Sequence, residues 1–307
     1  MSRIVATGLA FPEGPVAMPD GSVILVEIRA GNLTRVLPGG AKEVIAHVGG
    51  GPNGAAIGPD GHAYICNNGG FKWYDRDGMM LPGHQADDYA GGRIERVNLA
   101  TGQVERLYDA VDGRRLRGPN DIVFDAHGGF WFTDLGKGRN ADLDRGGIFY
   151  GRVDGSLVKQ VAWPLLTPNG IGLSPDGRTL YAAETESCRV YAWNILAPGE
   201  VDTTPADAPK GGRMIYASPT FARFDSLAVE ADGNVCVATL HQSGITVVSP
   251  VGGRVEFVPV APGRDWMVTN ICFGGADMKT AWVTCSGTGT LVEMAWARPG
   301  LKLLQQR

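Results

Sequence analysis

The sequence predicts an all-β protein: a six-bladed β-propeller in which residues 1–307 form a single domain. Three observations support this fold. Short β-branched and aromatic runs follow one another along the chain, Asp-Gly turns separate many of them, and each of six repeats begins with a polar residue. In the first five repeats the turn glycine lies at the same offset from that polar residue. We call these six residues the leaders: Glu13, Asn53, Asn120, Asn169, Asp225 and Asn270.

Each repeat is expected to supply three or four strands. The first apolar runs are residues 16–17, 55–57, 122–124, 171–173, 227–229 and 271–272. The runs after the turn are residues 23–26, 63–66, 130–132, 180–183, 235–238 and 281–283. Two such runs joined by Asp-Gly predict a β-hairpin. Third runs are residues 33–36, 93–97, 148–150, 189–193, 245–248 and 290–294, and outer strands are expected at 43–45 and 104–107. Repeats of this size are typical of propeller blades, and the recurring turn register disfavours a two-sheet sandwich.

Composition narrows the classes of partner and compartment. The net charge of −4 argues against a nucleic-acid or anionic-membrane partner. The N-terminus has no apolar signal-peptide region, and no apolar run approaches the length of a membrane span. The five cysteines form no Cys-x-x-Cys pattern and fall mostly within strand runs, as small buried apolar residues do in a reducing compartment. We therefore expect a cytoplasmic location.

The leaders predict a cation site. In a propeller the first strand of each blade lines a central channel, so equivalent leaders should meet at one mouth of it. All six carry oxygen, which favours a hard cation such as Ca²⁺ or Mg²⁺, with Mn²⁺ possible and Zn²⁺ less natural. Asn53 and Asn270 also suit an ordinary cap or turn. The turn carboxylates, in the opposite register, are interpreted as turn residues on the far face: Asp20, Asp60, Asp176 and Asp232.

Four motifs occur in the order seen in a known family. They are Phe11-Pro12-Glu13-Gly14-Pro15, Gly118-Pro119-Asn120-Asp121, Pro168-Asn169-Gly170-Ile171 with Ser174-Pro175-Asp176-Gly177, and Phe224-Asp225-Ser226-Leu227. The chain resembles the gluconolactonase, regucalcin and luciferin-regenerating-enzyme family over residues 9–294.

The resemblance implies a six-bladed propeller with one divalent metal in the channel. It implies that Glu13, Asn169 and Asp225 bind the metal, and that Asn120 contacts the metal, its water or the substrate. Asp225 also matches the family's proposed general base. The expected metal is Ca²⁺, with Zn²⁺, Mn²⁺ and Mg²⁺ as alternatives. No role is implied for Asn270.

The resemblance and the leaders together predict a metal-dependent hydrolase that opens a small-molecule lactone, such as a sugar-acid lactone. No Gly-x-Ser-x-Gly elbow suggests a serine nucleophile. Two alternatives stay open: hydrolysis of other esters or organophosphates on the same scaffold, and a calcium-binding propeller without catalysis. The oligomeric state is not predicted.

Substrate contacts are expected from four further residues besides Asn120. Asn67 and Trp73 belong to an aromatic insertion at residues 67–92, which we interpret as a lid over the metal or as an oligomer contact. Asp134 and His241 end, or directly follow, strands that run toward the leaders. A polar loop at residues 136–147 could add charged contacts.

Overall fold

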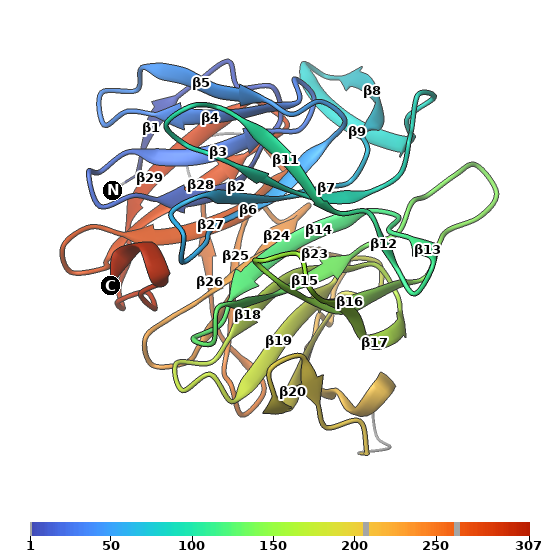
Figure 1. Ribbon diagram of the computed structural model, residues 1–307. Helices are drawn as coiled ribbons and strands as arrows, with labels where there is room; N and C mark the ends of the chain where they lie inside the picture. Colours follow the sequence, from blue (N-terminus) through green and yellow to red (C-terminus); the bar gives the residue numbers. More distant parts are fainter. Residues whose placement is uncertain (1, 205–208, 261–264) are drawn as a thin grey trace.

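The computed structural model describes residues 2–204, 209–260 and 265–307 and confirms the six-bladed propeller. Figure 1 shows the blades arranged around a common centre. Neighbouring inner strands contact one another in a closed ring. The inner strands are β2 (Pro12–Ala17), β6 (Pro52–Ile57), β14 (Pro119–Phe124), β18 (Pro168–Leu173), β23 (Arg223–Val229) and β27 (Val268–Gly274).

The second and third strands of each blade continue outward as antiparallel neighbours. The second strands are β3 (Val23–Glu27), β7 (Ala63–Asn67), β15 (Gly129–Asp134), β19 (Thr179–Glu184), β24 (Val235–Leu240) and β28 (Thr280–Cys285). The third strands are β4 (Asn32–Val36), β10 (Arg93–Val97), β16 (Gly146–Arg152), β20 (Arg189–Ala197), β25 (Gly244–Val248) and β29 (Thr290–Ala295). All twelve lie where the sequence placed apolar runs.

The outer strands close the blades. They are β5 (Lys42–His47), β11 (Val104–Tyr108), β17 (Val158–Leu165), β22 (Arg213–Ala217), β26 (Arg254–Pro259) and β1 (Ser2–Ala6). Strand β1 pairs with β29, so the beginning of the chain completes the last blade and joins the two ends of the ring. The ends of the chain accordingly lie on the same side of the molecule in Figure 1.

The structure also contains several shorter elements besides these strands. The insertion of the second blade is not one irregular loop, because it forms a hairpin of β8 (Phe71–Arg76) and β9 (Met79–Gln85). The remaining elements are β12 (Ala110–Val111), β13 (Arg114–Arg115), β21 (Glu200–Val201) and two 3₁₀ turns, η1 (Pro209–Gly211) and η2 (Leu304–Gln306). Within the described residues, no helix is long and apolar enough to cross a membrane.

The core is divided among the blade junctions. Six apolar clusters of the described residues each join one blade to the next around the ring. A typical junction is the one between the third and fourth blades, where Trp131 and Trp193 are almost fully buried. The five cysteines form no disulfide, and all except Cys188 are buried. Packing between blades therefore holds the inner strands, and the leaders on them, in a fixed ring.

Candidate active site

A one-residue bulge accompanies every leader. In all six blades the pairing of the inner strand with its neighbour shifts by one residue at the leader or directly beside it. A bulge bends the strand and redirects the local side chain. The leaders accordingly reach across blade boundaries. Asn270 Nδ2 donates to Glu13 Oε2 at 2.7 Å, and Asn53 Nδ2 donates to the main-chain oxygen of Asn120 at 3.3 Å.

Glycine after a leader lets neighbouring inner strands approach closely. A Cβ on Gly170 would lie 2.6 Å from the backbone nitrogen of Leu227 and 2.8 Å from the carbonyl oxygen of Asp225. A Cβ on Gly54 would lie 2.8 Å from the Cα of Asp121. Any side chain at these positions would therefore push the blades apart at this mouth, which we call the leader mouth.

Three buried carboxyl groups in the leader ring or next to it act on one another through their charges and have no basic partner among the described residues. Glu13, Asp121 and Asp225 are each less than a tenth exposed, and none of them forms an ion pair in the part of the chain that the structure describes. Burial raises the pKa of Glu13 to about 7. Burial, and then the charge of Glu13, raise the pKa of Asp121 to about 8 and that of Asp225 well above its ordinary value. These carboxyls are close enough to repel one another and lack a positive charge to balance them.

Two amide oxygens beside these carboxyls are also without a partner. Asn120 Oδ1 and Asn169 Oδ1 are buried and accept no hydrogen bond from any of the residues that the structure describes. The Asn169 nitrogen is held by Thr185 Oγ1 at 3.1 Å, which leaves the amide oxygen on the other side. An unpaired buried acceptor costs about 1–3 kcal/mol. Carboxylates and amide oxygens are the ligands that Ca²⁺ prefers, so the residues present fit a hard divalent cation.

Asn53 and Asn270 use their amides to hold other residues. Asn270 accepts from the backbone of Ile271 and donates to Glu13, while Asn53 accepts from Asn68 Nδ2 at 3.0 Å. Neither amide oxygen is unpaired, in contrast to those of Asn120 and Asn169. The leaders therefore fall into two groups. Glu13, Asn120, Asn169 and Asp225 carry the buried carboxyls and unpaired amide oxygens, whereas Asn53 and Asn270 hold neighbouring residues in place.

Two residues expected to meet substrate are occupied by the fold. Asn67 is fully buried, and its amide nitrogen donates to Gly49 O and Glu95 Oε2. Its amide oxygen accepts from two backbone nitrogens, so the hydrogen-bonding groups of this side chain are already used within the fold. The oxygens of Asp134 accept from the backbone nitrogens of Arg117, Gly118 and Gly136. Asp134 thus holds the segment that leads into Asn120.

The β8–β9 hairpin lies across the leader mouth. Its Trp73 ring packs on Phe11, just before β2, with ring centroids 5.1 Å apart. Met79 and Leu81 join an apolar cluster with Leu240 and Met267, which belong to the fifth and sixth blades at the same end of the wheel. The hairpin therefore spans from the second blade to the opposite side of the mouth, as a lid does.

His241 stands at the same end of the wheel. Its ring stacks on Trp266 with centroids 4.7 Å apart and planes at 12°, and the Phe221 ring lies tilted beside it with centroids 5.0 Å apart. Burial, followed by the charges of Arg223 and Arg76, lowers the pKa of His241. The ring is therefore a neutral, flat surface near neutral pH.

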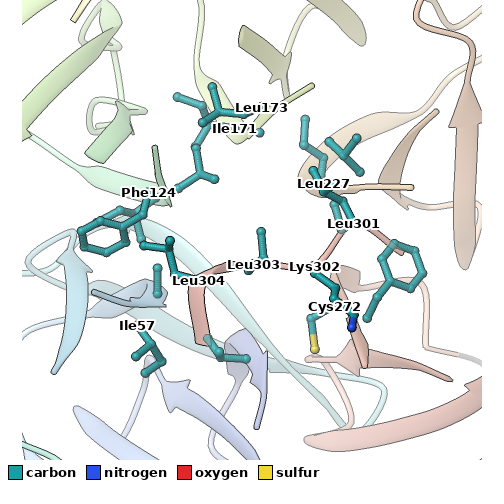
Figure 2. A pocket seen from close by; sticks show the side chains of 18 of the residues that line it. Ile57, Phe124, Ile171, Leu173, Leu227, Cys272, Leu301, Lys302, Leu303 and Leu304 are labelled. Carbon is teal, nitrogen blue, oxygen red and sulfur yellow. The ribbon is translucent and has the colours of Figure 1, made fainter. Parts of the chain in front are cut away.

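The opposite end of the channel has a different character. A cavity of about 220 Å³ lies beneath the leaders, lined by residues of all six inner strands and of the C-terminal segment 301–307. Figure 2 shows apolar side chains such as Phe124, Leu173 and Leu227 around it, with Leu303 and Leu304 of that segment among them. The segment is held by Gln306 Nε2, which donates to the carbonyl oxygen of Phe273 at 2.6 Å. Apolar side chains predominate in this lining, while Asp121 and Asn270 reach it from the leader ring and Asp125 and Asp176 from the turns.

A family comparison identifies the architecture. The family described as SMP-30/Gluconolactonase/LRE-like region matches residues 11–287, from just before β2 to just after β28. The chain belongs to this family. The match covers all six leaders, so it confirms the resemblance that the sequence motifs carried.

Individual relatives agree with this assignment. The chain is 24% identical to a gluconolactonase from Zymomonas mobilis over 294 residues, covering 89% of this chain and 75% of the relative. A solved gluconolactonase from Xanthomonas campestris has a TM-score of 0.74 at 21% identity and covers 96% of this chain and 89% of its own. A calcium-binding protein, regucalcin, from Agrobacterium tumefaciens has a TM-score of 0.73 at 19% identity, with 99% and 98% covered. These structures share the fold of this family member.

Proposed function

We propose that this protein hydrolyses a small-molecule lactone at the leader mouth. In this proposal Glu13, Asn169, Asp225 and Asn120 hold one divalent cation, and Asp225 is the general base. One observation carries it: three buried carboxyls without a counter-charge lie beside two buried amide oxygens without a partner. A cation would balance the charge and satisfy the oxygens at once. That Zymomonas and Xanthomonas relatives are named gluconolactonases supports a lactone as the substrate.

Ca²⁺ is the cation that the donor set favours. All the proposed donors are oxygens, and no cysteine or histidine is among them. The relative from Agrobacterium tumefaciens is described as calcium-binding, which supports the same choice. Mn²⁺, Mg²⁺ and Zn²⁺ are alternatives that a metal-replacement experiment distinguishes.

The side chains have distinct chemical tasks in this mechanism. When bound, a divalent cation supplies Lewis-acid stabilisation for the negative charge that develops on the lactone carbonyl oxygen. Asp225 accepts a proton from a water molecule as the water oxygen bonds to the carbonyl carbon. The bond from that carbon to the ring oxygen then breaks, and the ring oxygen takes up a proton to give the hydroxy acid. General-base assistance of this kind contributes about 10²–10⁴-fold.

The lid and the aromatic surface complete the pocket. Trp73 above Phe11 and the stacked pair of His241 and Trp266 offer flat faces to a ring-shaped substrate. Exclusion of water by the β8–β9 hairpin would strengthen the electrostatic interactions at the leaders. Asn120, on the ring itself, is placed to contact either the cation or the lactone.

A lactone panel tests the proposal. Protein stripped of metal would be assayed with a pH indicator against aldonic-acid lactones, aliphatic lactones, an aryl ester and an organophosphate, before and after addition of Ca²⁺, Mg²⁺, Mn²⁺ or Zn²⁺. We expect lactone turnover only after a cation is restored. Turnover of the aryl ester or the organophosphate alone would show that the substrate is not a lactone but belongs to that class. Stoichiometric Ca²⁺ binding with no turnover would instead indicate a calcium-binding propeller.

A further inference from the structure

Lys137 is a buried lysine near the leader mouth, in the loop between β15 and β16. It belongs to the polar loop at residues 136–147, yet its side chain is fully buried. Its Nζ donates to the carbonyl oxygen of Gly70 at 2.7 Å and to Asn68 Oδ1 at 3.3 Å, and lies 3.9 Å from the centre of the Phe71 ring. All three partners belong to the segment that leads into the lid. Among the described residues it makes no ion pair.

The charged surroundings of Lys137 come from several elements. Asp134 of β15 and Asp144 of the same loop act on it over longer distances, and Asp144 is itself bound by Arg139. Tyr89 of the lid segment places its ring 5.6 Å from Nζ. Burial lowers the pKa of Lys137 to about 7, and the two aspartates oppose that change. The lysine therefore occupies a site that is unfavourable for its charge, which calls for a specific reason for its presence.

A chain of amides runs from Lys137 to the leaders. Lys137 can only donate hydrogen bonds, so it fixes the oxygen of the Asn68 amide toward itself. The nitrogen of Asn68 then points the other way and donates to Asn53 Oδ1 at 3.0 Å. The nitrogen of Asn53 in turn faces Asn120 and donates to its main-chain oxygen at 3.3 Å. The backbone nitrogen of Gly70 also donates to Asn68 Oδ1, at 2.8 Å, so two donors that cannot accept hold the Asn68 amide in one orientation, and the Asn53 amide follows from it.

The chain ends in a spare donor. The Asn53 nitrogen carries two hydrogens, and one hydrogen bond from it is found among the described residues. Asn53 is buried on the ring and neighbours Asn120, whose amide oxygen is unpaired. If the Asn53 amide were reversed, its oxygen would face the main-chain oxygen of Asn120, and both can only accept a hydrogen bond.

We propose that Lys137 is a positioning residue that, through Asn68, holds Asn53 as a hydrogen-bond donor to the substrate oxygen on which negative charge develops. The inference rests on the proposed lactone hydrolysis, because it assigns a task within that reaction. Asn53 is the group that touches the substrate, and Lys137 acts through it. A donor aimed at a developing oxyanion acts mainly on kcat, since the bond strengthens in the transition state.

Three substitutions test the relay. Lys137→Met removes the ammonium and keeps the length of the side chain. Asn68→Asp keeps an acceptor for Lys137 but removes the donor to Asn53, and Asn53→Ala removes the last donor. We expect each to lower kcat about 10²-fold, the effect of losing one oxyanion donor, with a smaller change in KM. Ca²⁺ affinity should stay within about twofold, because none of the three residues is a proposed ligand.

The double variant Lys137→Met/Asn53→Ala decides whether the residues act as one unit. Its kcat should fall no further than that of the worse single variant, because residues acting through one contact are not additive. The matched control is Lys279→Met, which removes an exposed lysine from the turn between β27 and β28, far from the lid, and should leave kcat unchanged. Multiplicative losses in the double variant, or a wild-type kcat in Asn68→Asp, would overturn the relay.

A measurement without turnover separates this proposal from the proposed function. Side-chain amide signals of Asn53 and Asn68 would be followed by NMR in the Ca²⁺-loaded wild-type protein as pH rises through 7. We expect both signals to shift together with the Lys137 ammonium signal. In the Asn68→Asp variant, the Asn53 signal should no longer shift. A titrating Lys137 with an unmoved Asn53 signal contradicts the relay even if a lactone is hydrolysed. Absence of any lactone turnover, with coupled signals, counts against the proposed function alone.

Discussion

The two ends of the channel are built from the same six strands and differ in almost every chemical respect. At the leader mouth, oxygens are buried without partners and carboxyls lack a counter-charge. At the far end, apolar side chains line a cavity and turn carboxylates face water. The fifth blade carries both cases. Asp225 is buried with a raised pKa, whereas Asp232 is exposed in the turn and accepts from the backbone of Asn234 at 3.3 Å. The position on the wheel, rather than the residue type, decides what an aspartate can do.

The largest effect on kcat should come from Asp225→Asn, and the same exchange at the other end of this blade serves as its control. Asp225→Asn removes the proposed base while preserving shape. At saturating Ca²⁺ we expect kcat for the best lactone to fall by about 10²–10⁴-fold, the usual contribution of a general base. Steady-state kinetics and calorimetric titration with Ca²⁺ on the same sample measure the two properties separately.

Asp232→Asn is the matched control, because it makes the same chemical change on the same blade. We expect wild-type kcat and wild-type Ca²⁺ affinity for it. Full activity of Asp225→Asn with the cation bound would remove the base role. An equal loss in both variants would mean that blade stability, rather than chemistry at one mouth, is being measured.

A second, smaller effect should appear in the stability of the metal-free protein. Folded Glu13 has a pKa of about 7, above the ordinary value of about 4.3 for an unfolded glutamate. Between these values the folded state holds a proton that the unfolded state has lost, so the free energy of unfolding falls as pH rises from 5 to 7. One such carboxyl contributes at most about 1.4 kcal/mol per pH unit.

The variant Glu13→Gln cannot ionise at this position. The free energy of unfolding should be measured with denaturant at pH 5, 6 and 7. Relative to wild type, that of Glu13→Gln should rise by about 1–2 kcal/mol between pH 5 and pH 7, because only wild type loses stability as this carboxyl ionises. Excess Ca²⁺ should restore the stability of wild type more than that of the variant, because the cation favours the ionised carboxyl. Parallel pH profiles for the two metal-free proteins would contradict a strained acidic cluster at the leader mouth.

The sequence predicted the parts of the fold whose signal is local. Three strands of every blade follow from apolar runs and turns that succeed one another along the chain. The outer strands β17, β22 and β26, and the closing strand β1, were not predicted. Strands β22, β26 and β1 have mostly exposed or half-buried residues, and edge strands of this kind carry little apolar alternation. The pairing of β1 with β29 also joins opposite ends of the chain, which no local pattern can reveal.

The candidate site, like the fold, was predicted where the signal lies in the repeat and missed where it depends on packing. The leader register placed Glu13, Asn169 and Asp225 in one ring because equivalent residues of a repeat meet around an axis. Asp121 was missed as a separate carboxyl, since only its place at a bulge, buried near Glu13 and Asp225, sets it apart from a turn aspartate. The burial of Lys137 depends on contacts with a segment 67 residues earlier in the chain. Such contacts arise from packing between blades rather than from spacing.

The smallest expected effect on activity is at the far end. Removal of residues 303–307 deletes Leu303 and Leu304, which line the cavity, and the hydrogen bonds from Gln306 to Phe273 O and Ala17 O. Because both leucines are only partly buried, the loss should cost about 2–3 kcal/mol. For a protein of this size we expect the melting temperature to fall by about 5 °C, while kcat at saturating Ca²⁺ stays within about twofold. Gln306→Ala keeps both leucines and loses only the side-chain hydrogen bonds to Phe273 O and Ala17 O and the one from the Leu303 backbone nitrogen, so it should show a smaller shift than the truncation. A tenfold loss of kcat in a truncated protein that is still folded at the assay temperature would show that the two ends of the channel are coupled, and that the lactone site extends below the leaders.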